Sequence, residues 1–148
     1  MEGIEVKKLL NTDVNRLQEL LLVFKDVFEW PSFTMPSETH LQKILQSPQH
    51  LVFVALLDDA IVGGLTAYLL PEFETETYLV YIYDLAVQTE HQRKGIGKRL
   101  IAGINEYCKQ QGIAEVFVQA DEEDDYAIDF YRKTGGKEMK VAQFTYAL

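Results

Sequence analysis

Residues 78–99 read Tyr-Leu-Val-Tyr-Ile-Tyr-Asp-Leu-Ala-Val, then Gln-Thr-Glu-His, then Gln-Arg-Lys-Gly-Ile-Gly-Lys-Arg. The aromatic and β-branched residues of the first part predict a strand. The glycines of the last part predict a tight turn, and the apolar residues at four-residue intervals from Ile96 to Cys108 predict an amphipathic helix. A strand that passes through a glycine turn into a helix begins a parallel βαβ crossover, and this element decides the fold.

The turn at residues 92–98 has the properties of a site for a phosphate-bearing ligand. A helix N-terminus leaves backbone N–H groups without partners and carries a partial positive charge. Gly95 and Gly97 have no Cβ, so the backbone can turn tightly and phosphates can approach closely. The side chains that add positive charge or a neutral donor at this place are Arg93, Lys94, Lys98 and Gln92.

Two well-known phosphate loops differ from this turn. A P-loop requires G-x-x-x-x-G-K-[ST], but Gln92 stands at its first glycine and Arg99 at its Ser/Thr. The dinucleotide fingerprint requires a third small residue, and Leu100 occupies that position. Asp121 follows the next predicted strand, where a ribose-binding acid would lie, so a nucleotide-binding half-domain stays open as an alternative.

Length and composition indicate a single domain, residues 1–148, with the 47% hydrophobic and 25% charged content of a soluble globular protein. The N-terminus lacks the basic-then-apolar pattern of a signal peptide, and the longest aliphatic run, residues 51–57, is too short to span a bilayer. The single cysteine, Cys108, excludes an internal disulfide and agrees with a reducing compartment. We therefore expect a cytoplasmic protein without a membrane partner.

The net charge of −9 is unevenly distributed along the chain. Residues 88–111 hold five Lys/Arg against two acids, whereas residues 115–129 hold seven acids and no Lys or Arg. A positive block beside a negative one indicates an anionic cofactor next to a cationic substrate, although acidic runs also serve to solubilise loops. Nucleic acid is disfavoured as a partner, because phosphate contacts need a basic face and this chain is acidic.

Hydrophobic periodicity and turn residues predict an α/β (α+β) fold. We expect a mixed, mainly antiparallel sheet of six to seven strands with about four helices and one parallel βαβ crossover. The predicted strands cover residues 4–9, 51–57, 61–69, 78–87, 116–120 and 137–146, and the predicted helices cover residues 12–28, 36–46, 96–111 and 124–134.

This order of elements, with Gln-Arg-Lys-Gly-Ile-Gly at residues 92–97, resembles the GNAT superfamily of N-acetyltransferases, whose pyrophosphate loop is written Q/R-x-x-G-x-G/A. Residues 67–74, 81–87, 118–125 and 130–135 are similar to segments of the type I aminoglycoside 3-N-acetyltransferases. The chain departs from that family where Glu123 replaces a Gly and Tyr126 replaces a Pro. Both departures fall in the acidic loop and therefore concern the range of substrates.

The resemblance implies a site for acetyl-CoA. Backbone amides of the turn would hold the pyrophosphate, and the end of the preceding strand would splay from its neighbour, often at a β-bulge, to offer groups to the pantetheine arm and the thioester carbonyl. The resemblance also implies that Tyr131 protonates the departing thiolate. The implied cofactor-binding residues are Leu85, Ala86, Val87, Gln92, Arg93, Lys94, Gly95, Ile96, Gly97 and Lys98.

Acetyl transfer needs a neutral amine, because an ammonium group, with a pKa of about 10.4, has no lone pair. Asp84 interrupts a strand of Tyr, Leu, Ile and Val, where Asp is unfavourable, so we expect it to position the amine and take its proton, directly or through water. A structural carboxylate is the other interpretation. Further acids could bind the other ammonium groups of a polyamine. The expected substrate-binding residues are Glu72, Glu74, Tyr83, Asp84, Asp121, Glu123, Asp124 and Asp125.

The sequence thus favours an acetyl-CoA-dependent N-acetyltransferase that acts on a small cationic amine, with the 3-amino group of an aminoglycoside as the first choice. Polyamines and protein amino groups are alternative acceptors, and a catalytically silent acyl-CoA-binding module is an alternative of another class. The histidines show no metal-ligand spacing, so we expect no metal. The resemblance also implies a possible homodimer through the last strand or an exposed sheet edge.

Overall fold

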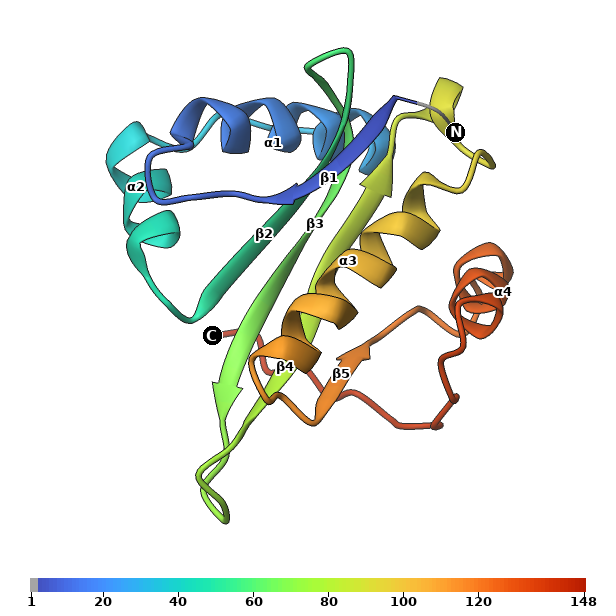
Figure 1. Cartoon of the computed structure of the whole chain (residues 1–148). Coiled ribbons are helices and arrows are strands. Elements are labelled where there is room, and N and C mark those ends of the chain that lie inside the picture. The colour runs from blue at the N-terminus through green and yellow to red at the C-terminus, as the bar shows by residue number, and fades with distance from the viewer. Residues whose placement is uncertain (1–2) are drawn as a thin grey trace.

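The computed structural model describes residues 3–148, which form one sheet and its covering helices (Figure 1). The order of elements follows the predicted one up to the last helix, and their boundaries lie within a few residues of the predicted ones. The elements are β1 (Ile4–Lys8), α1 (Val14–Phe28), α2 (Glu38–Gln46), β2 (His50–Leu57), β3 (Ala60–Pro71), β4 (Tyr78–Val87), the 3-10 turn η1 (Thr89–His91), α3 (Ile96–Gln110), β5 (Glu115–Val118) and α4 (Asp125–Lys133).

Within the described residues the sheet has five strands in the order β1-β2-β3-β4-β5. Each of the first four pairs antiparallel with its neighbour, and β5 pairs parallel with β4. Helix α3 joins β4 to β5, which confirms the predicted parallel crossover. The mixed, mainly antiparallel α/β architecture is therefore confirmed, with five strands instead of six to seven.

Two hydrophobic layers cover the two faces of the sheet, because the strands alternate apolar side chains to both sides. Helices α1 and α2 bury Leu20, Phe24 and Leu41 against one face. Helix α3 buries its four-residue stripe, which includes Leu100 and Ile104, against the other face (Figure 1). None of the helices within residues 3–148 has the length and apolar character that crossing a bilayer requires.

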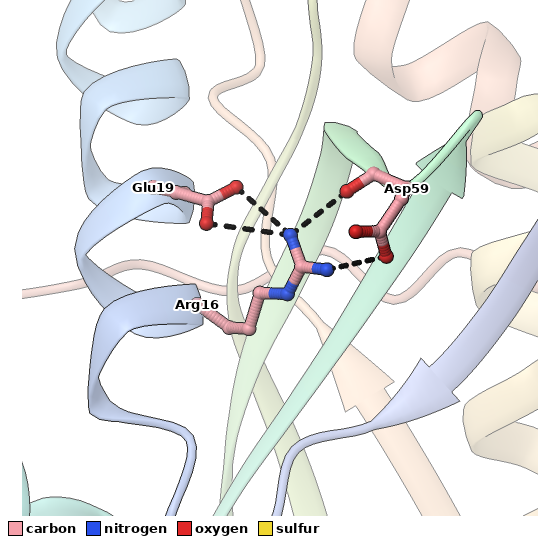
Figure 2. Close-up of polar contacts among 3 residues, drawn as sticks. All are labelled: Arg16, Glu19 and Asp59. Carbon is pink, nitrogen blue, oxygen red and sulfur yellow. Dashed lines mark hydrogen bonds and ion pairs between the residues drawn. The ribbon is translucent and has the colours of Figure 1, made fainter.

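The turn between β2 and β3 is fastened to α1 by one arginine (Figure 2). Asp58 and Asp59 both adopt left-handed backbone angles, with φ of 49° and 67°, which close a tight hairpin. The Arg16 guanidinium donates to the Asp59 carbonyl oxygen at 2.8 Å and forms ion pairs with the Asp59 and Glu19 carboxylates. The charges of the two carboxylates raise the pKa of Arg16 despite the opposing effect of burial. This contact holds the hairpin, and thereby β3, against the helix layer.

The predicted last strand, residues 137–146, is wrong for the described chain. After α4 the chain continues to residue 148 without helix or strand, and Phe144 and Tyr146 stay 81% and 85% exposed. The alternation of apolar residues in this segment is typical of a strand. Alternation specifies which side chains share a face, but a strand exists only where a neighbour receives its backbone hydrogen bonds.

Candidate active site

The site lies where β4 and β5 separate. Strand β5 pairs with Leu79–Ile82 only, whereas β4 continues for five residues beyond Ile82. A bulge opposite Thr66 and Ala67 of β3 places one extra residue, Tyr83, on β4 just where β5 ends. The predicted splay is thus confirmed: Leu85, Ala86 and Val87 are bonded to β3 on one side and have no β5 partner on the other. An extended ligand can use that open edge.

The glycine turn follows directly after this open edge. Arg93 and Gly95 have positive φ angles of 61° and 83°, and Gly95 is the residue before α3. Nothing lies within 4 Å of the Cβ that a larger residue would place at Gly95, so its backbone angle, not crowding, requires a glycine there. Lys94 and Lys98 are exposed beside the turn, and the N-terminus of α3 directs its backbone N–H groups to the same place.

Gln92 and Gly97 of the turn have structural roles that the sequence analysis did not predict. The Gln92 side chain donates from Nε2 to the Val87 carbonyl oxygen at 2.9 Å, so it braces the turn against the end of β4. A Cβ on Gly97 would lie 3.0 Å from the Phe130 ring. Gly97 is therefore required by the close approach of α4 to α3, in addition to any approach by a phosphate.

Asp84 lies on β4 between the bulge residue Tyr83 and the open edge that begins at Leu85. Its Oδ2 accepts a hydrogen bond from Thr66 Oγ1 at 2.7 Å, and the carboxylate is half-buried. Burial raises the pKa of Asp84, and the hydrogen bond from Thr66 offsets part of that rise because it favours the charged form. A half-buried carboxylate with a raised pKa is a better proton acceptor than an exposed one.

Three tyrosines, Tyr68, Tyr81 and Tyr83, lie beside Asp84 and are here called the tyrosine wall. Of these, the sequence analysis predicted Tyr83 only. Tyr68 and Tyr81 face each other across β3 and β4, and the Tyr83 ring lies 5.7 Å from Tyr68 and 5.8 Å from Tyr81. Phe117 extends the wall by stacking on Tyr81 at 4.7 Å. Burial, and to a smaller extent the Asp84 charge, raises the pKa of both Tyr68 and Tyr81, so these rings share its side of the sheet. The signal for Tyr81 was its spacing of two residues from Tyr83, which also suits an ordinary strand, whereas Tyr68 lies on the neighbouring strand and had no such signal.

Tyr131 lies on α4 and packs against the core layer of α3. Burial raises the pKa of its phenol to about 12, and the nearby Asp124 carboxylate acts in the same direction. Tyr131 therefore keeps its proton throughout the neutral range. This state agrees with the predicted role of an acid and excludes that of a resting base.

The expected acidic residues other than Asp84 divide into two groups, one in the loop before β4 and one after the end of β5. Glu72 and Glu74 lie in the loop between β3 and β4 (Figure 1). Asp121, Glu123 and Asp124 lie between β5 and α4, and Asp125 is the first residue of α4. The described chain does not bring the two groups together.

Several of these carboxylates also have local structural roles. Glu72 accepts from the Thr75 and Thr77 hydroxyls, which lowers its pKa. Asp121 accepts from the Glu123 N–H at 3.0 Å, and Asp124 caps α4 by accepting from the Ala127 N–H at 3.0 Å. Glu123 and Asp125 are exposed.

Cys108 is buried in the core, where it serves as a packing residue, and burial raises the pKa of its thiol to about 11. No group of three or more His, Cys, Asp or Glu side chains within residues 3–148 is arranged to hold a metal ion.

Comparison with known proteins gives a match to the profile of the acetyltransferase (GNAT) family over residues 15–136. An aminoglycoside acetyltransferase from an uncultured soil metagenomic sample, meta-AAC0020, is similar in two structures. Its complex with trehalose is 47% identical, with a TM-score of 0.96 over 99% of this chain and 97% of that one. Its complex with sisomicin is 46% identical, with a TM-score of 0.97 over the same shares.

A second soil metagenomic aminoglycoside acetyltransferase, HMB0005, is 36% identical, with a TM-score of 0.91 over 98% of each chain. The aminoglycoside N-acetyltransferase AAC(6′)-Iy in complex with CoA is 18% identical, with a TM-score of 0.81, over 97% of this chain and 94% of that one. At that identity the likeness concerns the fold alone.

Proposed function

Because the chain belongs to the acetyltransferase (GNAT) family, we propose that it transfers the acetyl group of acetyl-CoA to an amino group of an aminoglycoside, at the 3-amino position. The observation that carries this proposal is the position of Asp84. The half-buried carboxylate lies between the open edge of β4, which suits the cofactor, and the tyrosine wall, which suits a sugar-like cationic acceptor. The full-length likeness to aminoglycoside acetyltransferases supports the choice of acceptor.

The residues around the opening fit acetyl-CoA, which when bound supplies an activated acetyl group as a thioester. The open edge of Leu85, Ala86 and Val87 offers backbone donors and acceptors to a pantetheine arm and an N–H to a carbonyl oxygen. The backbone of the glycine turn, with Lys94 and Lys98 beside it, fits a pyrophosphate group. Arg93 stacks over the Tyr126 ring, 5.2 Å from its centroid, which orients its charge.

Asp84 and Tyr131 each act on a different proton, Asp84 as the base for the acceptor amine and Tyr131 as the acid for the leaving thiolate. Asp84 takes a proton from the acceptor ammonium, directly or through one water, and leaves the amine lone pair free. Tyr131 donates its phenol proton toward the sulfur as the thiolate leaves. A phenol with a pKa of about 12 holds its proton more tightly than a thiol with a pKa of about 8.5, so complete transfer to the thiolate is unfavourable unless the phenolate is reprotonated in the same step. The attacking nitrogen, which must lose a second proton to become an amide, would supply that proton.

The acceptor side of the site uses aromatic rings and carboxylates. The exposed faces of Tyr68 and Tyr83 can pack on sugar rings and attract protonated amines, and the exposed Glu123 and Asp125 can pair with further ammonium groups. The complex of the similar aminoglycoside acetyltransferase meta-AAC0020 with sisomicin supports an aminoglycoside as the acceptor.

A substrate panel tests the acceptor class. Thiol release from acetyl-CoA is measured with sisomicin, gentamicin, kanamycin, spermidine and an N-terminal peptide set, and two-dimensional NMR of the product locates the acetyl group. We expect turnover with the aminoglycosides and acetylation at the 3-amino group. Acetylation at another amine would overturn the position alone, and preference for spermidine or peptides would overturn the acceptor class.

The Asp84→Asn variant tests the catalytic part of the proposal. General-base catalysis contributes about 10²- to 10⁴-fold, so we expect turnover to fall by that amount while the affinity for acetyl-CoA is retained. Near-normal turnover would exclude Asp84 as the base. If wild-type protein binds acetyl-CoA but no amine accelerates thiol release, the chain is an acyl-CoA-binding module instead.

We also propose that the enzyme works in the cytoplasm and as a homodimer. Cys108 is the single cysteine of the sequence and is buried as a free thiol, which agrees with a reducing compartment. Fractionation of cells that express the protein at native level tests its location.

A further inference from the structure

His50 is the first residue of β2, and it adds one more ring beside the tyrosine wall. It pairs with Tyr68 across the ladder between β2 and β3. Val52 and Val54, which follow His50 at two-residue spacing, pack in the layer formed by α1 and α2. Because alternate residues of a strand share a face, the His50 side chain lies on the α1 and α2 side of the sheet.

Tyr68 shares that side of the sheet with the proposed base. Its neighbours on β3, Ala67 and Leu69, pack in the α3 layer, so Thr66 and Tyr68 point to the opposite side. Thr66 donates its hydrogen bond to Asp84 on this side, and Tyr68 is partly exposed there. An acceptor that reaches Asp84 therefore approaches the side of the sheet on which the Tyr68 ring is accessible.

The Tyr68 ring is held between two other rings. The His50 ring centroid lies 5.3 Å from it at an interplanar angle of 68°, and the Tyr83 centroid lies 5.7 Å away at 84°. Both are edge-to-face contacts, a preferred geometry for aromatic pairs. The Tyr81 hydroxyl donates to Gln119 Oε1 at 2.8 Å, whereas within residues 3–148 the Tyr68 hydroxyl has no hydrogen-bond partner. Ring packing therefore sets the orientation of Tyr68, and half-buried His50 is the firmer support because Tyr83 is 60% exposed.

The position of His50 is itself fixed by the backbone. Its N–H donates to the Ser47 carbonyl oxygen at 3.2 Å, and the Leu69 N–H donates to the Gln49 carbonyl oxygen at 2.8 Å, which joins the start of β2 to β3. The His50 Nδ1 atom is buried and has no hydrogen-bond partner in the part of the chain that the structure describes. A buried nitrogen without a partner is unfavourable, so the contact with Tyr68 depends on the shape of the ring and not on its polarity.

We propose that His50 is a positioning residue for the acceptor. Its ring holds the Tyr68 ring in the orientation in which the exposed part of Tyr68 packs on a sugar ring of the aminoglycoside bound at Asp84. The inference rests on the proposed function and extends the acceptor side of the site from β3 to β2. His50 acts through Tyr68, so it affects the affinity for the acceptor and not the transfer of protons.

Steady-state kinetics with sisomicin test this role. An aromatic contact of this kind changes affinity by about 2- to 10-fold, so His50→Ala should raise the KM for sisomicin by that factor. Both kcat and the KM for acetyl-CoA should keep their wild-type values. His50→Phe retains a ring and should restore the KM for sisomicin.

A histidine elsewhere in the chain provides the matched control. His40→Ala removes the same side chain from an exposed position on α2 and should behave as wild type. An unchanged KM for sisomicin in His50→Ala would overturn the proposal. A raised KM that His50→Phe does not restore would also overturn it.

A double variant separates an indirect role from a direct contact with the acceptor. His50→Ala/Tyr68→Leu should have the KM of Tyr68→Leu alone, because the ring through which His50 acts has been removed. If the double variant instead raises KM by the product of the two single effects, His50 acts independently of Tyr68 and the positioning role is wrong.

Nuclear Overhauser effects between ring protons give a readout that needs no acceptor. Wild-type protein should show such effects between Tyr68 and Tyr83, and they should weaken in His50→Ala and return in His50→Phe. Effects of wild-type strength in the alanine variant would overturn the positioning role. Failure of the wild-type protein to acetylate any aminoglycoside would overturn the proposed function instead, so the two failures are distinguishable.

Discussion

Thr66 Oγ1 donates a hydrogen bond to Asp84 Oδ2 at 2.7 Å, across the two strands that carry the bulge. The bond favours the charged carboxylate, whereas burial favours the neutral acid, and burial is the larger effect because the pKa of Asp84 is raised. The charged carboxylate of Asp84 therefore lowers the free energy of unfolding. The effect of Asp84 on stability and its proposed role as a base can be measured separately.

Asp84→Asn should lose activity and gain stability. A carboxyl group whose pKa is raised by folding destabilises the folded state above that raised pKa, and the penalty vanishes as pH falls toward the ordinary value of about 4. Thermal unfolding across this range should thus show the variant more stable than wild type at neutral pH, with the difference shrinking in acid. A variant less stable than wild type at neutral pH would mean that Asp84 is a structural carboxylate.

Thr66→Val should move the pH dependence of the reaction. Without the hydroxyl donor the pKa of Asp84 rises further, so the acidic limb of kcat/KM against pH should shift to higher pH. Thr66→Ser keeps the donor and is the control, for which we expect the wild-type profile. An unshifted acidic limb in the valine variant would show that another group limits the rate in acid.

Tyr131→Phe removes the proposed proton donor while keeping the ring that packs against the α3 layer. We expect kcat to fall by about 10²-fold or more, with little change in the KM for the acceptor. Because the phenol pKa is about 12, wild-type activity should not decline in alkali through loss of this proton below about that pH. Full activity of the phenylalanine variant would assign Tyr131 to packing alone.

The two glycines of the turn should respond differently to substitution. Gly97→Ala drives a Cβ into the Phe130 ring and should lower the free energy of unfolding by about 1–3 kcal/mol, with partial recovery when Phe130 is also changed to Leu.

Gly95→Asn tolerates the positive φ and should fold normally, whereas Gly95→Asp adds charge and should weaken binding of acetyl-CoA. Calorimetric titration with acetyl-CoA measures both Gly95 variants, and equal affinities would exclude a pyrophosphate there.

The tyrosine wall should contribute to the affinity for the acceptor alone. A ring that attracts a cation contributes about 0.5–2 kcal/mol, so Tyr68→Leu or Tyr83→Leu should raise the KM for the aminoglycoside by about 2- to 30-fold. The KM for acetyl-CoA should not change. Tyr78→Leu, at the far end of β4, is the matched control and should behave as wild type. Equal effects of all three variants would indicate loss of strand stability rather than loss of a binding surface.

The elements could be predicted well because their signals are local. Apolar residues at helical spacing place α3 within one residue of its observed end, and the glycine turn before it marks its start. The open edge at Leu85–Val87 was implied by the family resemblance. The bulge residue Tyr83 and the partner Thr66 could not be recognised, since both depend on the register between β3 and β4, which alternation alone does not fix.

The roles of individual acidic residues also could not be predicted from the sequence. Composition showed that residues 115–129 are strongly negative. It could not show that Asp121 and Asp124 have turn and capping roles, or that Glu72 is bonded to threonines in the loop before β4. Those roles depend on distances between side chains that only the folded chain defines.

The sequence by itself determined the crossover of residues 78–110, the glycine turn and the unusual Asp84 in an apolar strand, because each follows from neighbours in the chain. Tertiary structure alone decided what surrounds Asp84 and whether residues 137–148 form a strand. Burial and register create the environment of a carboxylate, and a strand needs a partner for its hydrogen bonds. Residues 137–146 have a strand-like pattern in the sequence, but within residues 3–148 they form no strand because no neighbouring strand receives their backbone hydrogen bonds.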